Sequence, residues 1–401
     1  MSLIDNNLAS RMDRVQSPLI PFVGELIQNN PGTISLGQGV VSYPPPERAI
    51  ASVQSFLKRG DHLYKAVTGI EPLKAVIKTK LTNDNQIEIT DKNCIVVTAG
   101  SNMAFMNAVL AITQAGDEVI LNTPYYFNHE MAITMANCRP VLVDTDSNYQ
   151  LDIKAISQAI TPKTKAVVTI SPNNPTGAVY SKDSLKAVND LCRDRHIYHI
   201  SDEAYEYFTY DGVKHYSPAS FRNSKAHTIS LFSLSKAYGF AGWRIGYMVI
   251  PQHLLMPIKK VQDTNLICPP VVSQYAATGA LETGKNYCQQ HLKEIAFIRT
   301  IVGDKLRSIP NICSVSSSYG AFYYFLKVNT NLNDLELTKE LIEKYKVATI
   351  PGSTFGIRNS CYLRVAYGSL QPSIAEIGIE RLITGLKDIC GNNEDRALLY
   401  K

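Results

Sequence analysis

Residues 228–250 read TISLFSLSKAYGFAGWRIGYMVI. In this stretch Lys236 stands shortly after the apolar run 229–232 and lies among Ser, Ala and Gly rather than among charged residues. Most lysines stay in water. Apolar surroundings and a neighbouring cation lower the pKa of an amine, so that its neutral form can attack a carbonyl. The stretch therefore predicts a buried strand that ends beside a reactive lysine.

The same stretch carries groups suited to a phosphate. Ser233 and Ser235 precede Lys236, and Arg244 follows it, so two hydroxyls and a fixed cation accompany the amine. Together these groups can hold an aldehyde that bears a phosphate, such as pyridoxal 5'-phosphate. The alternative is an ordinary solvated lysine after a strand. The coenzyme interpretation is favoured over the solvated lysine if the chain also supplies a carboxylate for the pyridine nitrogen and further donors for the phosphate.

Apolar runs alternate with helical stretches for much of the chain after Cys94. The runs expected to be strands fall at about 94–98, 118–122, 140–144, 166–170, 197–201, 228–232 and 245–250. Continuous apolar strands separated by helices predict an α/β fold with a mostly parallel seven-stranded sheet sandwiched by helices. Ligands of such sheets bind at the carboxyl ends of the strands.

A smaller α+β unit is expected after the sheet, with strands at 320–328, 347–352 and 361–368 and helices at about 334–345 and 372–388. We predict three parts. Residues 1–45 form an N-terminal arm and part of the small domain, residues 46–285 form the large domain, and residues 286–401 form the C-terminal small domain.

Polar and aromatic residues follow the first two predicted strands. Ser101 and Asn102 come just after Gly100 at the start of an apolar helix, where free amides and the helix dipole attract an anion. Ser101 could instead simply cap that helix. Tyr126 follows the second strand, where its ring could stack on a planar cofactor or pack in the core.

The loops after the fourth and fifth strands carry further candidates. ISPNNPTGAVY (170–180) holds Asn174 between two prolines that stiffen the backbone. Asp202 ends the fifth run, and a carboxylate there costs several kcal/mol unless a cation or several donors meet it. A pyridinium nitrogen would serve as that cation, and Tyr205 could donate to the phenolic oxygen of the same ring.

Seven motifs in this order resemble the fold-type I pyridoxal-phosphate enzymes. They are SLGQG (35–39), YKAVTG (64–69), SPNNPTG (171–177), SDEAY (201–205), SLSKAYGFAGWRIGY (233–247), PGSTFG (351–356) and YLRVAYG (362–368). The chain is most similar to the class I/II aminotransferases of the aspartate aminotransferase superfamily, and the resemblance covers nearly all of it.

The resemblance implies a role for each matching residue. Lys236 would form the aldimine and move the substrate proton, and Asp202 would hold the pyridine nitrogen. Asn174 and Tyr205 would bind the phenolic oxygen of the ring, and Tyr126 would stack on the ring face. Arg364 would bind the substrate carboxylate, together with Asn174 and the backbone near Gly37. The phosphate would be bound by Ser101, Asn102, Ser233, Ser235 and Arg244, joined by Tyr64 of a neighbouring subunit. A homodimer with shared active sites is therefore expected.

The implied reaction moves an amino group between an L-amino acid and a 2-oxo acid. Relatives with the same residues eliminate, cyclise or oxidise, so a cyclodehydratase or an oxidase acting on arginine or hydroxyarginine is the alternative. A catalytically silent binding module would lack the lysine or the aspartate, and neither is missing. Candidates for the side-chain pocket are Gln16, Ser17, Asp263, Thr264 and Asn265. No arginine occurs in 245–298, which disfavours aspartate as the preferred substrate.

Composition narrows the class of protein. The 401-residue chain has a net charge of +5, with Lys and Arg spread along it and no basic block, so no nucleic-acid partner is expected. No apolar run is long enough to span a membrane and the N-terminus lacks a signal-peptide core, so we expect a cytoplasmic protein. The eight cysteines have no C-x-x-C spacing. No metal site is expected.

Overall fold

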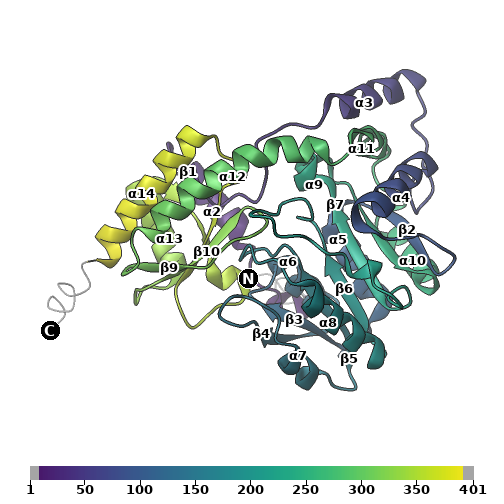
Figure 1. Cartoon of the computed structure of the whole chain (residues 1–401), viewed down its shortest axis with the longest axis horizontal. Helices are drawn as coiled ribbons and strands as arrows, with labels where there is room; N and C mark the ends of the chain where they lie inside the picture. The colour runs from purple at the N-terminus through teal and green to yellow at the C-terminus, as the bar shows by residue number, and fades with distance from the viewer. Residues whose placement is uncertain (1–8, 392–401) are drawn as a thin grey trace, which may run out of the picture.

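A seven-stranded sheet forms the centre of the computed structural model, which describes residues 9–391. The strand order is β2-β8-β7-β6-β5-β3-β4 (Figure 1). The strands are β2 (Asn93–Thr98), β3 (Glu118–Thr123), β4 (Arg139–Asp144), β5 (Thr164–Ile170), β6 (Tyr198–Asp202), β7 (Thr228–Ser233) and β8 (Gly246–Pro251). The pairs among β3 to β7 are parallel. The predicted fold class is confirmed.

Strand β8 is the antiparallel member of the sheet and lies between β2 and β7. Its first residue, Gly246, pairs with Thr98 at the end of β2 and with Ser233 at the end of β7. Residues that precede β8 therefore lie at the same edge of the sheet as residues that follow β2 and β7. This arrangement brings Arg244 to the carboxyl edge, although Arg244 comes before a strand and not after one.

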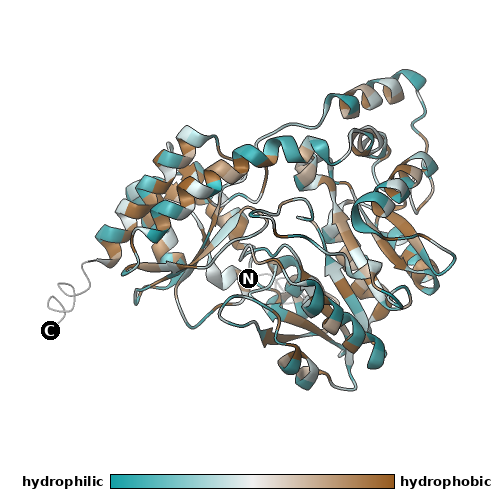
Figure 2. Cartoon of the chain, viewed as in Figure 1, coloured by the Kyte–Doolittle hydropathy of each residue, from teal (hydrophilic) through white to brown (hydrophobic). Residues whose placement is uncertain are grey.

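Alternate residues of each strand face opposite sides of the sheet, as the two-residue period of a strand requires. Val96, Leu231 and Met248 pack with helices α5, α6 and α10, whereas Phe232 and Tyr247 pack with α4 and α11. Figure 2 shows that the central strands are mostly hydrophobic. The helices over the sheet are α4 (Glu71–Asn85), α5 (Gly100–Ile112), α6 (Phe127–Met135), α7 (Ile153–Ala159), α8 (Lys182–Asp194), α10 (Leu255–Leu266) and α11 (Val271–Thr283). Helix α3 (Glu47–Arg59) packs on α11.

Short polar caps fix where several helices begin. Asp152 accepts a hydrogen bond from the Ala155 amide at the start of α7, and Ser181 accepts one from the Ser184 amide at the start of α8. Such caps satisfy amides that have no partner within the helix. The short helix α9 (Leu234–Ala237) directly follows β7 and carries Lys236.

A second, four-stranded sheet has the order β12-β13-β10-β9 and antiparallel pairing. Its strands are β9 (Cys313–Val315), β10 (Tyr323–Val328), β12 (Ile350–Pro351) and β13 (Tyr362–Ala366). The helices around it are α12 (Asn286–Arg307), α13 (Asp334–Tyr345) and α14 (Pro372–Cys390). Figure 1 shows α12 running from the side of the large sheet to this smaller one.

The first two described helices contact different parts of the molecule, the first lying against α6 and the second against β12 and α13. Helices α1 (Arg11–Arg14) and α2 (Leu19–Gln28) come first, and β1 (Ile34–Ser35) pairs in parallel with β11 (Val347–Ala348). The division into 1–45, 46–285 and 286–401 stays a prediction, and its two ends lie outside the described residues. Within residues 9–391, no helix has the length and apolar character needed to cross a membrane.

Candidate active site

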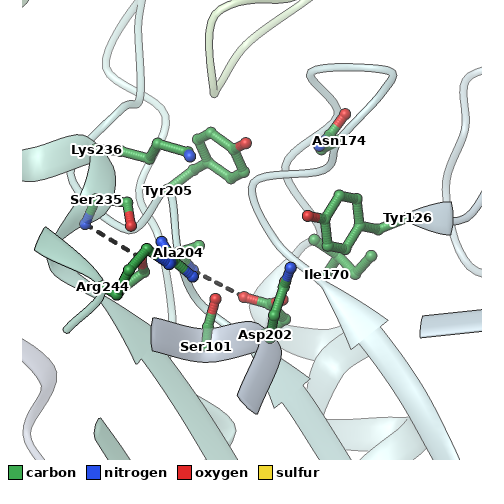
Figure 3. Close-up of a pocket in the computed structure, with 12 residues that line it drawn as sticks. Ser101, Tyr126, Ile170, Asn174, Asp202, Ala204, Tyr205, Ser235, Lys236 and Arg244 are labelled. Carbon is green, nitrogen blue, oxygen red and sulfur yellow. Dashed lines mark hydrogen bonds between the residues drawn. The ribbon is translucent and has the colours of Figure 1, made fainter. Parts of the chain in front are cut away.

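A cavity opens at the carboxyl edge of the large sheet, where the sequence predicts the ligand (Figure 3). The space among its walls is about 460 Å³, including the part open to solvent. Its lining contains Ser101, Asn102, Tyr126, Ile170, Asn174, Asp202, Ala204, Tyr205, Ser233, Ser235, Lys236 and Arg244. The structure therefore brings together every predicted coenzyme-binding residue except Tyr64.

Lys236 points into this cavity from α9 (Figure 3). The hydroxyl of Ser233 accepts a hydrogen bond of 3.2 Å from the Ser235 amide, which fixes the turn before the lysine. Burial, and after it the charges of Arg244 and Arg364, lower the pKa of the Lys236 amine to about 8, while Asp202 acts in the opposite direction. A substantial fraction of the amine is therefore neutral, and nucleophilic, near neutral pH.

Asp202 ends β6 and is buried. Its Oδ1 atom accepts a hydrogen bond of 3.1 Å from the Ala204 amide, and its Oδ2 atom lies 3.1 Å from Nε2 of His129. The ring of His129 stacks on Phe105, with 3.9 Å between the ring centroids. The carboxylate thus lies between its own loop and helix α6.

His129 is a site residue that the sequence reasoning missed. It lies in α6, three residues after Tyr126, and is buried. The sequence offers only a weak signal for it, since histidine is intermediate in how often it is buried. The contact with Asp202 depends on how α6 crosses the end of β6, and the spacing of residues does not reveal that crossing.

Hydroxyl, amide and guanidinium donors converge at one end of the cavity. Ser101 and Asn102 lie in the first turn of α5, and Arg244 reaches the same place from the turn before β8. Gly100 adopts a φ of +81°, and a Cβ atom there would come within 2.5 Å of Nη2 of Arg244. The N-cap residue of α5 is Ala99 and not Ser101. The alternative in which Ser101 serves as the helix cap is therefore wrong, and its side chain lines the cavity.

Arg364 lies in the middle of β13, with 2% of its surface exposed. Its Nη1 donates to Oδ1 of Asn174 at 2.8 Å, and its Nη2 donates to the carbonyl of Gly37 at 2.7 Å. The guanidinium stands over the rings of Tyr323 and Phe355, at 4.5 and 5.0 Å from their centroids. Arg364, Asn174 and the backbone of Gly37 thus lie together, and their binding of a substrate carboxylate stays a prediction.

Tyr323 is a second residue that the sequence reasoning missed. Its hydroxyl lies 2.7 Å from the hydroxyl of Tyr205, and a Cβ atom on Gly39 would come within 2.6 Å of it. The same ring faces the Arg364 guanidinium. Tyr323 therefore joins the smaller sheet to a lining residue of the cavity, and only a glycine at position 39 leaves room for it.

Some predicted residues do not line the cavity. Tyr64 lies in the loop between α3 and α4 and is 76% exposed, so it stands apart from the cavity of its own chain. Gln16 contacts the carbonyl of Thr354 at 3.5 Å. Three other residues suggested for the side-chain pocket are exposed on α10, namely Asp263, Thr264 and Asn265. Their role, like that of Gln16 and Ser17, stays a prediction.

The charges around the cavity suit a particular kind of ligand. Lys236, Arg244 and Arg364 are cations, whereas Asp202 is the acidic residue among the lining side chains. An excess of cations favours a ligand with anionic groups at both ends, and the isolated carboxylate favours a cationic nitrogen between them. A phosphorylated pyridine aldehyde joined to an amino acid has this distribution of charge, so the residues present fit that coenzyme.

Comparison with known proteins identifies the family. The sequence profile of the family described as aminotransferase class I and II matches residues 31–382. The chain belongs to this family. The predicted family and enzyme class are thereby confirmed, and this aminotransferase is an enzyme of a family that depends on pyridoxal phosphate.

Individual relatives agree with the family assignment. The aminotransferase is 33% identical to the probable aspartate/prephenate aminotransferase of Aquifex aeolicus, over 95% of this chain and 99% of that protein. It is 30% identical to aromatic-amino-acid aminotransferase 2 of Thermococcus litoralis, over 95% and 98% of the two chains. Among solved structures, aspartate aminotransferase from Thermus thermophilus with maleate superposes with a TM-score of 0.87 at 26% identity, over 95% and 100% of the chains.

Proposed function

We propose that this aminotransferase binds pyridoxal 5'-phosphate in the cavity at the sheet edge and transfers an amino group between an L-amino acid and a 2-oxo acid. The observation that carries the proposal is that the amine of Lys236 and the carboxylate of Asp202 line one cavity, with phosphate-binding donors at one end of it. When bound, the coenzyme supplies a ring that accepts the electron pair left when a bond to the substrate Cα breaks.

The residues of the chain would hold the coenzyme at four places. Asp202, oriented by His129, would keep the pyridine nitrogen protonated, and Tyr126 would cover the ring face. Tyr205 and Asn174 would donate to the phenolic oxygen. The phosphate would be met by Ser101, Asn102, Ser233, Ser235 and Arg244, which share the cavity.

Lys236 would move the proton of the reaction. Because burial and two nearby guanidinium groups lower the pKa of its amine to about 8, Nζ can take a proton from the substrate Cα and release it again near neutral pH. A lysine with an ordinary pKa would hold its own proton and could not act as this base. The same lowered pKa favours the covalent attachment of an aldehyde.

Arg364 would bind the substrate carboxylate. Its guanidinium is buried and already oriented by Asn174 and by the Gly37 carbonyl, and its Nε has no hydrogen-bond partner among the described residues. A planar fork of donors suits a carboxylate better than the point charge of a lysine. We also propose a homodimer in which Tyr64 of each chain completes the other's phosphate site. The cytoplasmic location stays a prediction.

The test is product analysis with a panel of amino acids, each with and without a 2-oxo acid. Turnover that requires the 2-oxo acid, with products of matching mass, is the expected result, and the Lys236→Ala variant should give none. Loss of water without an acceptor would instead indicate elimination or cyclisation, and oxygen consumption would indicate an oxidase. Either of these outcomes would overturn the proposed transamination. The panel also identifies the amino acid preferred, whether aromatic, acidic or cationic.

A further inference from the structure

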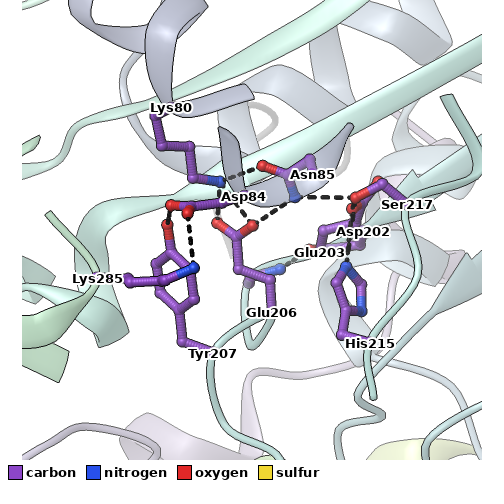
Figure 4. A network of polar contacts seen from close by, with 11 residues as sticks. Lys80, Asp84, Asn85, Asp202, Glu203, Glu206, Tyr207, His215, Ser217 and Lys285 are labelled. Carbon is purple, nitrogen blue, oxygen red and sulfur yellow. Dashed lines mark hydrogen bonds and ion pairs between the residues drawn. The ribbon is translucent and has the colours of Figure 1, made fainter. Parts of the chain in front are cut away.

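A buried network of polar side chains lies behind the loop that carries Asp202 and Tyr205 (Figure 4). Lys80 of α4 pairs with both carboxylate oxygens of Glu206, at 2.5 and 2.6 Å. Asn85 joins the pair, accepting from Lys80 at 2.7 Å and donating to Glu206 at 2.7 Å. The side chains of Lys80 and Glu206 are only 6% and 8% exposed. This ion pair is therefore an internal one, unlike most pairs on a protein surface.

Glu203 forms the other half of the network. Its side chain is fully buried, accepts a hydrogen bond from the hydroxyl of Ser217, and lies 2.9 Å from Nε2 of His215. Asn85 links the two halves because it also donates to the Ser217 hydroxyl at 2.9 Å. One carboxylate oxygen of Glu203 has no hydrogen-bond partner among the described residues. Two carboxylates that follow β6 thus share one connected set of partners, and Glu206 also lines a pocket on the outer side of that set.

The side chains of residues 202–206 point in two directions, some into the cavity and others into the buried network. Asp202 and Tyr205 line the cavity, whereas Glu203 and Glu206 belong to the network. The backbone between them is short, and the amide of Glu206 donates to the carbonyl of Glu203 at 3.1 Å. A shift of either glutamate would therefore move the backbone that carries Asp202 and Tyr205.

The network also contacts the strand that leads to Lys236. Nζ of Lys80 stands 4.6 Å from the centroid of the Phe232 ring, and Phe232 directly precedes Ser233 of the cavity. A buried ion pair costs desolvation energy, and two apolar residues of similar size are often as stable, so stability alone does not account for the pair. Its place directly behind two segments of the active site points to a role in holding those segments.

We propose that Glu206 and Glu203, held by Lys80, Asn85 and Ser217, are positioning residues that set how Asp202 and Tyr205 meet the coenzyme. The inference rests on the proposed function, because it concerns the ring of the bound coenzyme. Neither glutamate touches the cavity, so each acts through the backbone of residues 202–206.

Glu206→Gln tests the proposal, because it removes the charge while keeping the size of the side chain. Glu118→Gln is the matched control. Glu118 is also a buried carboxylate, it pairs with Arg139 and accepts from Thr161 at 2.7 Å, but it begins β3 at the opposite end of the sheet. The apo form of each variant is titrated with pyridoxal phosphate, and its melting temperature is measured without the coenzyme. The pH midpoint of the visible absorption band is then recorded.

Both variants should lose thermal stability, but Glu206→Gln should also weaken coenzyme binding by about tenfold or more, the size of effect expected for groups coupled through one network and a shared backbone shift. It should shift the pH midpoint of the visible band as well, whereas Glu118→Gln should leave affinity and midpoint unchanged. A coenzyme affinity of Glu206→Gln within about twofold of that of the wild type, together with an unchanged pH midpoint of the visible band, would overturn the inference.

If Glu206→Gln does not fold, the double variant Lys80→Met with Glu206→Leu decides, because replacing both partners with apolar residues removes the buried charges. A folded double variant with weakened coenzyme binding supports the inference, and one with wild-type binding overturns it. Should the wild type itself take up no pyridoxal phosphate, the proposed function falls as well. Normal uptake by both the wild type and Glu206→Gln overturns the positioning role alone.

Discussion

The amine of Lys236 should react with small aldehydes as a group with a pKa near 8, the value to which its surroundings lower it. At pH 7.5 about a quarter of such an amine is neutral, against about 0.1% for a lysine with a pKa of about 10.5, which is roughly a 240-fold difference in the reactive form. This difference is large enough for the reaction rate of Lys236 to be compared with that of another lysine in the same chain.

The assay is reductive methylation of the apo-protein with formaldehyde over a series of pH values. Mass spectrometry of the digested protein then gives the extent of modification at each lysine. Lys58 is the internal reference, because it lies exposed on α3. The rate at Lys236 should rise as pH increases through about 8, since the neutral amine is the nucleophile and forms as the proton leaves.

Two substitutions test what lowers the pKa of Lys236. They should move the pH midpoint of its methylation rate in opposite directions. Arg364→Met removes a cation that lowers the pKa of Lys236, so the midpoint should rise. Asp202→Asn removes the carboxylate that raises this pKa, so the midpoint should fall. Changes of about one pH unit are typical of a single nearby charge. The electrostatic reasoning would be refuted by a wild-type midpoint above about 10, or by two variants that move it in the same direction.

Three further predictions concern the substrate, the phosphate and the partner subunit. Arg364→Lys should raise KM for the amino acid by about 10- to 100-fold with a smaller change in kcat, because a charged hydrogen bond is lost; an unchanged KM in steady-state kinetics would contradict this role. Gly100→Ala should lower coenzyme affinity by more than about tenfold, since a Cβ atom would meet the Arg244 guanidinium and the residue has a positive φ; wild-type affinity in a titration would count against the phosphate site. Mixing Tyr64→Ala with Lys236→Ala subunits should restore activity above that of either variant alone, because one site of the hybrid dimer is intact; no gain on mixing would show that Tyr64 does not act across the subunits.

The sheet could be predicted closely because its strands are short apolar runs with clear boundaries. The run 228–232 and the strand Thr228–Ser233 differ by one residue, and the other strands agree to a similar degree. The direction of β8 could not be read from its sequence, because a buried strand is equally apolar whether it runs parallel or antiparallel. Arg244 could therefore be grouped with Lys236 by its nearness in the sequence, but the strand pattern did not place it at the carboxyl edge.

The candidate site was predictable wherever a residue lies at the carboxyl end of a strand or within a few residues after it. Asp202 and Lys236 are of this kind, because the carboxyl ends of parallel strands meet at one edge. His129 and Tyr323 were not predictable, since they reach the site from a helix and from the smaller sheet. Their contacts depend on the packing of elements distant in sequence, and no local pattern encodes that packing.

Glu203 and Glu206 show a further limit of sequence reasoning. Both stand in the motif SDEAYEY, where charged residues after a strand suggest a solvated loop. In the structure both side chains are largely shielded from water, Glu206 by Lys80, which lies on a helix more than a hundred residues earlier, and Glu203 by Ser217 and His215. The charges cancel only in the folded chain, so the sequence alone gives no reason to expect them inside.

The central claim is that Lys236 forms a covalent bond with pyridoxal phosphate in this cavity. The most direct measurement is borohydride reduction of the protein loaded with the coenzyme, followed by mass spectrometry of its peptides. We expect a phosphopyridoxyl group on Lys236 and loss of the visible absorption band in Lys236→Ala. A modified lysine elsewhere, or no modified peptide at all, would contradict the claim.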